Sequence, residues 1–322
     1  MKALALFSGG LDSLIAVKLI QSQGIDVQGV TFETPFFHAR RAVDAAEQIA
    51  LPLSVLDITE DHLAMLRAPR YGYGRYLNPC IDCHAMMLRK AGALLEAMGA
   101  HFLITGEVLG QRPMSQTRQS LHVVAKYSGY PDLVLRPLSA KLLPPTLPER
   151  EGWVDRERLG DIQGRGRKRQ MEAAELFAIR DYSPPAGGCL LTDPMFVKRL
   201  RELFDHDDFE IASVKLLRSG RHFRIGDHTK VIVGRNQSDN RRIQKYAREE
   251  DLVLVTEDFP GPTTIVPGGC SEAETLIAAS LCVLYSDAPD GKTVSVHGIR
   301  GGQTFTFESA AADRDDAARW II

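Results

Sequence analysis

The sequence lacks the long apolar runs and repeats that mark membrane and fibrous proteins. No stretch reaches the roughly 18 consecutive apolar residues that a transmembrane helix needs. The short apolar start after Lys2 ends at Ser8-Gly9-Gly10, earlier than the core of a secretory signal peptide would end. With 44% hydrophobic and 25% charged residues, the 322-residue chain has the composition of a globular protein long enough for two domains.

Cysteine is scarce and its number is odd. Five cysteines in a chain of this length do not make a disulfide framework. Without an export signal they indicate reduced thiols, so we expect a cytoplasmic protein with no membrane partner.

A strong excess of either charge is also missing, because the formal net charge is only −2. The distribution is uneven, however. Residues 211–248 carry ten basic and two acidic side chains, whereas residues 249–322 carry four basic and thirteen acidic ones. A total near zero therefore does not exclude a polyanionic partner such as RNA.

The pattern of apolar residues changes along the chain. Up to about residue 140, runs typical of strands (3–7, 27–32, 53–57, 101–105) alternate with helical spacing (13–23, 39–50, 83–98). This alternation predicts an α/β fold with a doubly wound parallel sheet, whose ligands bind beyond the carboxyl ends of its strands. Beyond about residue 200, one helix (273–285) and short strands (214–217, 223–225, 230–233, 252–256, 293–297) predict a smaller α+β domain. We expect domains at 1–198 and 199–322.

The strongest local motif is the string SGGLDS, residues 8–13, between the first strand and the first helix. Its two glycines allow a tight turn close to an anion, and the helix N-terminus offers unpaired N–H groups. Ser8 and Ser13 add hydroxyl donors, while Asp12 can hold Mg²⁺ or position a phosphate. Neither GxxxxGK[ST] nor GxGxxG is present, which argues against the usual P-loop and against a dinucleotide site. A capped glycine-rich turn without a ligand is the structural alternative.

This string resembles the PP-loop of the N-type ATP pyrophosphatases, which cleave ATP between the α and β phosphates and adenylate a carbonyl oxygen. The resemblance implies an adenine nucleotide alpha hydrolase-like fold, with ATP and Mg²⁺ as cofactors. It implies that the pyrophosphate end is held by Ser8, Gly9, Gly10, Asp12 and Ser13. Thr31 and Phe32 would lie near the adenosine, and Thr105-Gly106-Glu107 would lie on the same edge.

Two further stretches indicate which PP-loop enzymes the sequence resembles most. Gly110-Gln111 and Ser115-Gln116 resemble a Leu-Gly-Gln and Ser-Gln stretch of the ThiI-type tRNA thiouridine synthetases. Arg136-Pro137-Leu138 resembles a segment common among PP-loop enzymes. The similarity to PP-loop thiolases of the ThiI, MnmA and TtuA type covers about residues 1–195 and implies that Asp12 and Gln111 act in the nucleotide site.

Three cysteines form a second candidate site. Cys80 and Cys83 make a C-x-x-C at a predicted helix N-terminus, and Cys189 lies far downstream in a loop rich in proline and glycine. Three thiolates with one open position suit a [4Fe–4S] cluster that binds an extra sulfur, and thiolases of the TtuA and TtcA type resemble this arrangement. A helix N-terminus and nearby cations would also lower the thiol pKa values, which suits a persulfide or disulfide pair. We expect no chemistry from Cys270 and Cys282.

The basic segment interleaves its charges with apolar residues at strand period, so its cations are expected on one face of a sheet that reads phosphates. Residues 211–300 resemble the NFACT-R (DUF814-like) domain, an RNA-associated module, in the strings VGRNQSDN, DLVLV and FPGP. A solvated charged surface is the alternative. The candidate RNA-binding residues are Arg165, Arg167, Lys168, Arg169, Arg221, Arg224 and Arg235.

These features together predict an ATP-dependent tRNA sulfurtransferase. It would adenylate a uridine carbonyl, and sulfur from sulfide or from a persulfide made by a cysteine desulfurase would displace AMP. One alternative is a PP-loop sulfur-insertion enzyme or amidotransferase that acts on a small molecule. Another is an RNA-binding protein without catalysis. The oligomeric state stays open, a homodimer being one possibility.

Overall fold

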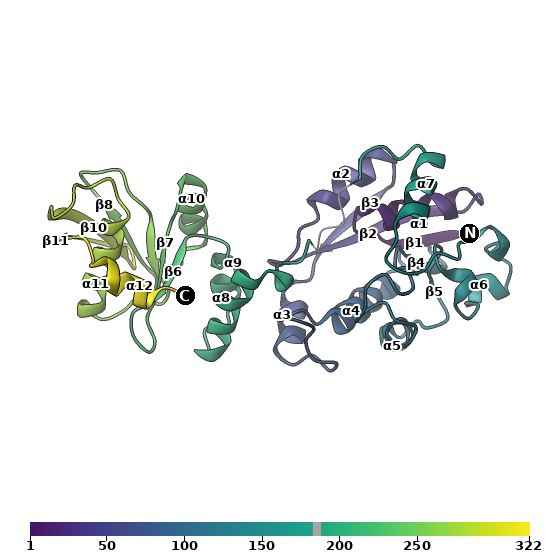
Figure 1. The fold of residues 1–322 in the computed structure, drawn as a ribbon, viewed down its shortest axis with the longest axis horizontal. Coiled ribbons are helices and arrows are strands. Elements are labelled where there is room, and N and C mark those ends of the chain that lie inside the picture. Colours follow the sequence, from purple (N-terminus) through teal and green to yellow (C-terminus); the bar gives the residue numbers. More distant parts are fainter. Residues whose placement is uncertain (183–187) are drawn as a thin grey trace. The chain divides into compact units, whose positions relative to one another are not determined.

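The computed structural model describes residues 1–182 and 188–322, in two compact units, 1–192 and 193–322 (Figure 1). The predicted boundary after residue 198 falls inside helix α8 (Pro194–Asp205), which belongs to the second unit. The reason is an ion-pair network in which Glu202 of α8 contacts Arg224 and Lys230 of the second sheet. Part of the predicted loop before Cys189, residues 183–187, lies outside the described residues.

The first unit, in its described residues, is built on a five-stranded parallel sheet of order β3-β2-β1-β4-β5. The strands are β1 (Lys2–Leu6), β2 (Asp26–Glu33), β3 (Leu53–Asp57), β4 (Phe102–Thr105) and β5 (Val134–Leu135). The chain builds β1 to β3 in one direction and then crosses to β4 on the other side of β1. This confirms the predicted doubly wound sheet and puts its switch point at the carboxyl ends of β1 and β4.

Helices cover both faces of this sheet (Figure 1). One face carries α1 (Leu11–Gln21), α2 (Arg40–Gln48) and α7 (Lys168–Leu176). The other carries α3 (Thr59–Arg67), α4 (Cys80–Ala93) and α5 (Arg118–Ser128), while the short α6 (Leu147–Arg150) follows β5. In β1, Ala3 and Ala5 pack with α1, and Leu4 packs with α4, because successive side chains of a strand point to opposite faces.

The second unit, over residues 193–322, holds a six-stranded sheet of order β11-β10-β8-β9-β7-β6 with antiparallel pairings. The strands are β6 (Arg221–Arg224), β7 (Lys230–Val233), β8 (Leu252–Thr256), β9 (Thr264–Val266), β10 (Val294–Arg300) and β11 (Gln303–Ser309). Helices α9 (Ile211–Leu216) and α10 (Gln237–Tyr246) pack on one face, and α11 (Glu272–Leu284) and α12 (Arg314–Trp320) on the other. The predicted smaller α+β domain is confirmed.

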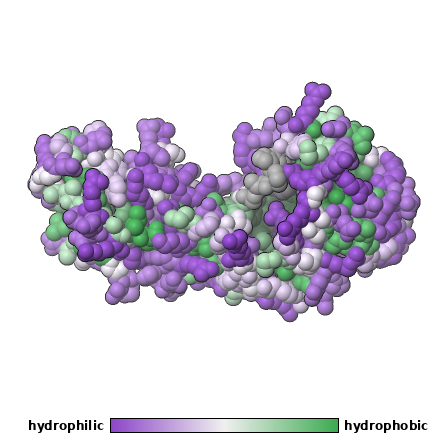
Figure 2. All heavy atoms as spheres, in the orientation of Figure 1, coloured by the Kyte–Doolittle hydropathy of each residue, from purple (hydrophilic) through white to green (hydrophobic). Residues whose placement is uncertain are grey.

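One predicted strand is wrong, since residues 214–217 lie at the end of helix α9 and beyond it. A short apolar run does not distinguish a strand from a buried helix segment. Hydrophilic residues cover most of the visible surface of each unit (Figure 2). Within the described residues, no helix combines the length and the apolar character that crossing a bilayer requires.

Candidate active site

The loop between β1 and α1 makes a tight turn at the switch point of the first sheet. Gly9 has a φ of +68°, in the left-handed region, and a Cβ there would lie 2.4 Å from the carbonyl oxygen of Arg41. Gly10 caps α1 with extended backbone and accepts a hydrogen bond of 2.8 Å from Ser13 Oγ. Ser8 Oγ lies 3.4 Å from Ser13 Oγ. The geometry therefore requires glycine at position 9 and leaves the start of α1 without a side-chain cap.

The chain that follows β4 packs directly on this turn. A Cβ at Gly106 would lie 2.5 Å from the backbone nitrogen of Ser13. No other residue fits at this position without displacing backbone. Sequence reasoning assigned Gly106 to nucleotide binding, and the structure gives it a packing role beside the same loop.

Asp12, in the first turn of α1, has one satisfied and one unsatisfied oxygen. Its Oδ2 accepts a hydrogen bond of 3.1 Å from Gln111 Nε2. Its Oδ1 is buried without a hydrogen-bond partner among the described residues. Burial raises the pKa of this carboxyl, while the hydrogen bond from Gln111 and the charge of Arg167 act in the opposite direction. A buried acceptor without a donor fits a Mg²⁺ ion, which prefers carboxylate oxygens.

Three arginines surround this turn. The Nη2 atom of Arg41, from α2, lies 3.7 Å from the position that a Cβ of Gly10 would take, and its Nε is buried without a hydrogen-bond partner in the described part of the chain. Burial lowers the pKa of Arg41, and the charge of Arg167 lowers it further. Arg112 and Arg167 both lower the pKa of Asp12. Cations gathered this closely repel one another unless an anion lies between them, which indicates a polyphosphate.

Sequence reasoning missed Arg41 and Arg112 and assigned Arg167 to RNA. Helix α2 begins at Arg40 and Arg41, and α7 begins at Lys168 with Arg167 as its N-cap; neither has an acidic residue in its first turn. Cations at a helix N-terminus oppose the helix dipole. This local conflict is the sequence signal that could have assigned these arginines to an anion site.

The expected adenosine contacts lie inside β2. Thr31 and Phe32 are both buried, at 5% and 3% exposure. Phe32 packs with Leu4 and Val30 in the core on the α4 side of the sheet. Its side chain therefore belongs to the core, and a contact of this segment with adenosine stays a prediction.

The three predicted thiols lie close to one another. Cys80 and Cys83 stand in the first turn of α4, and Cys189 directly precedes a 3₁₀ turn at Leu190–Thr192. Burial raises the pKa of Cys83 well above its usual value, and the charges of Cys189 and Cys80 add to this. Burial also raises the pKa of Cys189 to about 11, with Cys80 adding and Arg112 opposing. The predicted lowering of the thiol pKa values is therefore wrong for Cys83 and Cys189, because burial outweighs the helix N-terminus.

Two hydrogen bonds anchor this group. Asn78 Nδ2 donates to Cys80 Sγ at 3.3 Å. The backbone nitrogen of Leu190 donates to Phe36 O at 2.9 Å, which ties the Cys189 segment to the loop after β2. All five cysteines are free thiols.

The arrangement of the three cysteine thiols limits the kind of metal centre that they can hold. In residues 1–182 and 188–322, no three Cys, His, Asp or Glu side chains are close enough to hold a single metal ion. A cubane cluster instead spreads three thiolates over three irons, and three cysteines without a fourth protein ligand match that chemistry.

A buried ionic network lies behind the cysteine helix. Glu107 Oε1 is 2.9 Å from His84 Nδ1, and Glu107 Oε2 accepts a hydrogen bond of 3.0 Å from Arg136 Nε. Burial would raise the pKa of Glu107, but the charge of Arg136 and the hydrogen bond with His84 lower it to about 2. The carboxylate thus connects the end of β4 to α4 at the residue beside Cys83.

Two protein-family models match this chain, one in each unit. Residues 1–141 match the family model described as thiamine biosynthesis protein (ThiI), and residues 220–321 match the model described as NFACT protein RNA binding domain. We refer to the two units by these matches, as the ThiI domain and the NFACT-R domain. The ThiI match covers the phosphate loop, Cys80, Cys83 and the Arg136 network, and it ends before Cys189.

Solved structures provide similar folds. A 4-thiouridine synthetase–RNA complex with bound ATP is 22% identical, with a TM-score of 0.37, and the match covers 67% of this chain and 52% of that one. A predicted tRNA methyltransferase subunit from Methanocaldococcus jannaschii is 17% identical (TM-score 0.32; 42% and 69% covered). The C-terminal part of a fibronectin/fibrinogen-binding protein from Streptococcus suis is 15% identical (TM-score 0.29; 48% and 76% covered). Similarity at this level concerns the fold alone.

The four basic residues around the start of α7 have different surroundings. Arg167 lies by the phosphate loop of the ThiI domain, as described above. Arg169 pairs with Asp161, and Lys168 lies 4.0 Å from Glu172. Of the four residues predicted here to bind RNA, Arg165 alone has no described ion pair or effect on the Asp12 site.

The basic strand residues of the NFACT-R domain are largely neutralised. Arg224 is 12% exposed and pairs with Glu202 and with Asp208, the latter at 2.9 Å. Arg235 Nε lies 2.7 Å from Asp239 Oδ2. The guanidinium of Arg221 lies 4.5 Å from the centre of the Tyr285 ring. The protein's own carboxylates pair with Arg224 and Arg235, so these cations would have to exchange partners to bind phosphates, and their contact with RNA stays a prediction.

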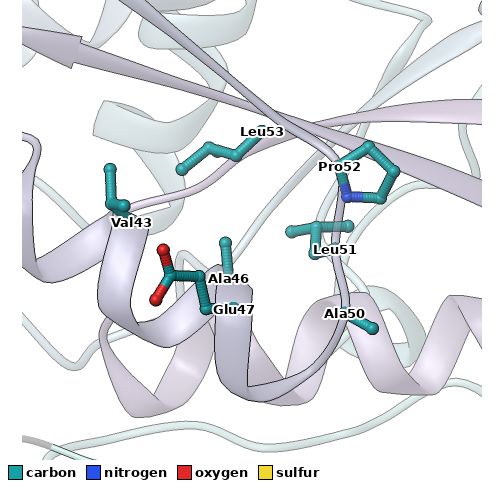
Figure 3. A pocket seen from close by; sticks show the side chains of 7 residues that line it. All are labelled: Val43, Ala46, Glu47, Ala50, Leu51, Pro52 and Leu53. Carbon is teal, nitrogen blue, oxygen red and sulfur yellow. The ribbon is translucent and has the colours of Figure 1, made fainter.

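A cavity of about 330 Å³ lies elsewhere in the ThiI domain (Figure 3). Glu47 is its one charged lining residue; the others are Val43, Ala46, Ala50, Leu51, Pro52 and Leu53. It adjoins the amino end of β3, whereas ligands of such sheets bind at the carboxyl ends. It contains none of the candidate site residues.

Proposed function

We propose that this protein is an ATP-dependent tRNA sulfurtransferase that forms a thiouridine. One arrangement carries the proposal. In the ThiI domain, Gly106 packs on the turn that holds Asp12, and the next residue, Glu107, contacts His84 beside the free thiol of Cys83. Arg112 also acts electrostatically on both Asp12 and Cys189. An enzyme that activates a carbonyl with ATP and then delivers sulfur needs both parts within reach of one base. The NFACT-R domain supports RNA as the substrate.

The nucleotide would bind at the turn before α1. Backbone N–H groups at Gly9, Gly10 and the start of α1 would hold the β and γ phosphates. Arg41 and Arg167 would neutralise their charge. The unpartnered Oδ1 of Asp12 would hold Mg²⁺, which when bound supplies charge stabilisation at the phosphates.

The first chemical step is adenylation. The uridine carbonyl oxygen attacks the α-phosphorus of ATP, the bond to the bridging oxygen breaks, and pyrophosphate leaves. The carbonyl oxygen, a poor leaving group on its own, then departs as AMP when sulfur attacks the ring carbon. Arg112 lies where it can act on both the leaving phosphate and the sulfur group, since its charge lowers the pKa values of Asp12 and Cys189.

The sulfur would be held at Cys80, Cys83 and Cys189. A [4Fe–4S] cluster on these three thiolates would supply an open iron position for sulfide. Without a cluster, one cysteine would carry a persulfide whose terminal sulfur attacks the activated carbon as AMP leaves. A second thiol then attacks the resulting mixed disulfide, which releases the thiouridine and leaves a Cys–Cys disulfide for an external thiol to reduce. The cytoplasm, where such reductants are present, is the expected compartment.

Mass spectrometry of tRNA nucleosides from a deletion strain tests this function. We expect one thionucleoside to disappear and to return with the wild-type gene. It should not return with Asp12→Asn or Cys80→Ala, whereas Cys270→Ser should restore it fully. An unchanged nucleoside profile in the deletion strain would overturn the proposal.

Sulfur insertion into a small molecule is a second candidate, because the matched family model is described as a thiamine biosynthesis protein. The same deletion strain separates the two. A growth requirement for thiamine together with normal tRNA nucleosides would support the small-molecule function. Absence of ATP–pyrophosphate exchange in the presence of tRNA would instead favour an RNA-binding protein without catalysis.

A further inference from the structure

The motif by which the second domain resembles NFACT-R is occupied by internal contacts. Asn236 Oδ1 accepts a hydrogen bond of 3.0 Å from the backbone of Asp239 and caps α10. Asp239 Oδ2 accepts from the backbone nitrogen of Gly220 at 3.0 Å, and Asn240 Oδ1 accepts from that of Thr263 at 3.0 Å. These side chains hold three loops together, so RNA contacts must come from other residues.

A group of cations lies on the helices next to this motif. Lys215 of α9 and Lys245 of α10 place their Nζ atoms 5.6 and 5.7 Å from the centre of the Tyr246 ring. Burial lowers the pKa of Arg218, and the nearby charge of Arg242 lowers it further. Two ammonium groups thus lie beside one aromatic ring, and Arg242 of α10 lies near Arg218, which follows α9. We call this surface the α9–α10 basic face (Lys215, Arg218, Arg242, Lys245 and Tyr246).

These cations differ from those of the strands in their partners. Within the described residues, no carboxylate lies within ion-pair distance of Lys215, Arg242 or Lys245, whereas Arg224 and Lys230 are paired with Glu202. The surface over α10 is hydrophilic where it projects in Figure 2. The opposite face of the sheet carries α11, whose first turn holds Glu272 and Glu274 and whose last turn has no basic residue.

Within the described residues, Lys215, Arg242 and Lys245 carry like charges with no carboxylate at ion-pair distance, and a polyanion that binds them removes their mutual repulsion while releasing its counterions. An aromatic ring between two ammonium groups also offers a surface on which an unpaired base can stack with a phosphate on either side. Double-stranded RNA offers no exposed base face for such stacking.

We propose that the α9–α10 basic face is the surface by which the NFACT-R domain binds RNA, with phosphates at the four cations and an unpaired base on Tyr246. The proposal rests on the proposed function in taking RNA as the partner. It moves the predicted contact from Arg221 and Arg224 of β6 and Arg235 of the loop before α10 to the two helices.

The test compares two full-length triple variants of equal charge change. Lys215→Gln/Arg242→Gln/Lys245→Gln alters the basic face, and Arg221→Gln/Lys292→Gln/Arg314→Gln alters the rest of the domain. Binding of a tRNA transcript is measured from 50 to 200 mM salt. We expect the first variant to bind at least tenfold more weakly, with a log K against log [salt] slope smaller by about 2 to 3. The second variant should stay within about twofold of wild type.

A stacking variant gives an independent readout. Tyr246→Leu should weaken binding to an unstructured oligouridine by roughly 5- to 100-fold and leave the salt slope unchanged. Thermal unfolding of each variant shows whether it folds. A folded basic-face variant that binds tRNA as wild type does, or a control variant that loses more affinity, would overturn the proposal, as would wild-type protein that binds no RNA.

The two proposals fail separately. If the deletion strain keeps all its thionucleosides while the basic-face variant still loses tRNA affinity, the sulfurtransferase function is wrong and the binding surface stands. If a thionucleoside disappears but both triple variants bind equally well, the function stands and the surface is wrong.

Discussion

Gln111 donates a hydrogen bond of 3.1 Å to Asp12, and this bond joins the loop after β4 to the first turn of α1. It orients a carboxyl group whose second oxygen has no hydrogen-bond partner among the described residues. Residues separated by almost a hundred positions in the chain therefore form one acceptor site at the switch point of the sheet.

Asp12→Asn should reduce ATP–pyrophosphate exchange by at least about 100-fold, because the metal-binding charge is lost. It should not lower the free energy of unfolding, since burial disfavours the charge in the first place. Exchange assays and urea unfolding measure the two effects. A variant that unfolds more easily would mean that the charge of Asp12 stabilises the fold, beyond the hydrogen bond that Gln111 donates.

Gly106→Ala should destabilise the ThiI domain by roughly 1 to 3 kcal/mol and disturb the phosphate loop, because its Cβ would lie 2.5 Å from Ser13 N. Gly166→Ala is the matched control, since a Cβ there meets nothing within 4 Å and its φ is ordinary. Thermal unfolding and ATP binding are the measurements. Equal effects of the two substitutions would contradict the close backbone contact.

Arg136→Met should cost about 3 to 5 kcal/mol of unfolding free energy, because it leaves the buried charge of Glu107 without its cation. The double variant Arg136→Met/Glu107→Gln should recover much of this loss, since the neutral amide can still contact His84. Chemical denaturation of the four proteins forms a double-mutant cycle. Additive losses would show that the pair is not coupled.

His62 makes stability depend on pH. It is fully buried between Phe36 and Phe37, neither ring nitrogen has a hydrogen-bond partner in the described residues, and burial lowers its pKa to about 4. The unfolded chain binds a proton near pH 6.5, so stability is complete above that pH and falls as the pH drops towards 4. We expect a loss of about 2 kcal/mol between pH 7 and pH 5.

His62→Leu should remove the part of this pH dependence that comes from His62, and unfolding curves at pH 7 and pH 5 measure it. His222 in the second unit, whose pKa burial also lowers, should keep its own part in both proteins. Glu107 does not interfere, because its depressed pKa of about 2 affects stability only as the pH falls below about 4.5. A wild-type protein equally stable at both pH values would show that the His62 ring finds a partner or opens to water.

Anaerobically purified protein should contain iron and show broad visible absorption if the three thiols hold a cluster. Cys80→Ala should abolish both signals, and Cys270→Ser should leave them intact. Colourless, iron-free protein that still thiolates tRNA would identify the persulfide route instead.

The phosphate loop could be predicted because all its residues are consecutive. Residues 8–13 contain the turn, the cap and the first helical turn, so local backbone preferences already specify the geometry. The C-x-x-C is local in the same way. Cys189 was recognisable because cysteine is rare, although its neighbours in space are far away in sequence.

The arginines of the site could not be found by spacing. Arg41, Arg112 and Arg167 come from three segments that only the order of the strands brings together. Arginine is common on surfaces, and its meaning appears only when its position on the folded edge is known. Their one local indication in the sequence was that α2 and α7 each begin with cations, which oppose the helix dipole.

The second domain was harder to predict in detail. Helix α10 has mostly polar residues, and its buried residues are Asp239 and Ile243, so few apolar positions mark it in the sequence. Arg224 and Lys230 belong to strands as expected, but their acidic partner Glu202 comes from α8. A local sequence pattern does not reveal pairing between charges that are distant in the chain, so the prediction of RNA-binding cations on this sheet did not include their carboxylate partner.

The separation of charge in the NFACT-R domain has a kinetic consequence. Cations on α9 and α10 and carboxylates at the start of α11 occupy opposite faces of one sheet, so the domain carries a dipole moment. In the field of an approaching polyanion, a dipole experiences a torque that turns its positive face forward before contact. Productive encounters should then be enriched over random collisions, and this enrichment should fade as salt shortens the Debye length.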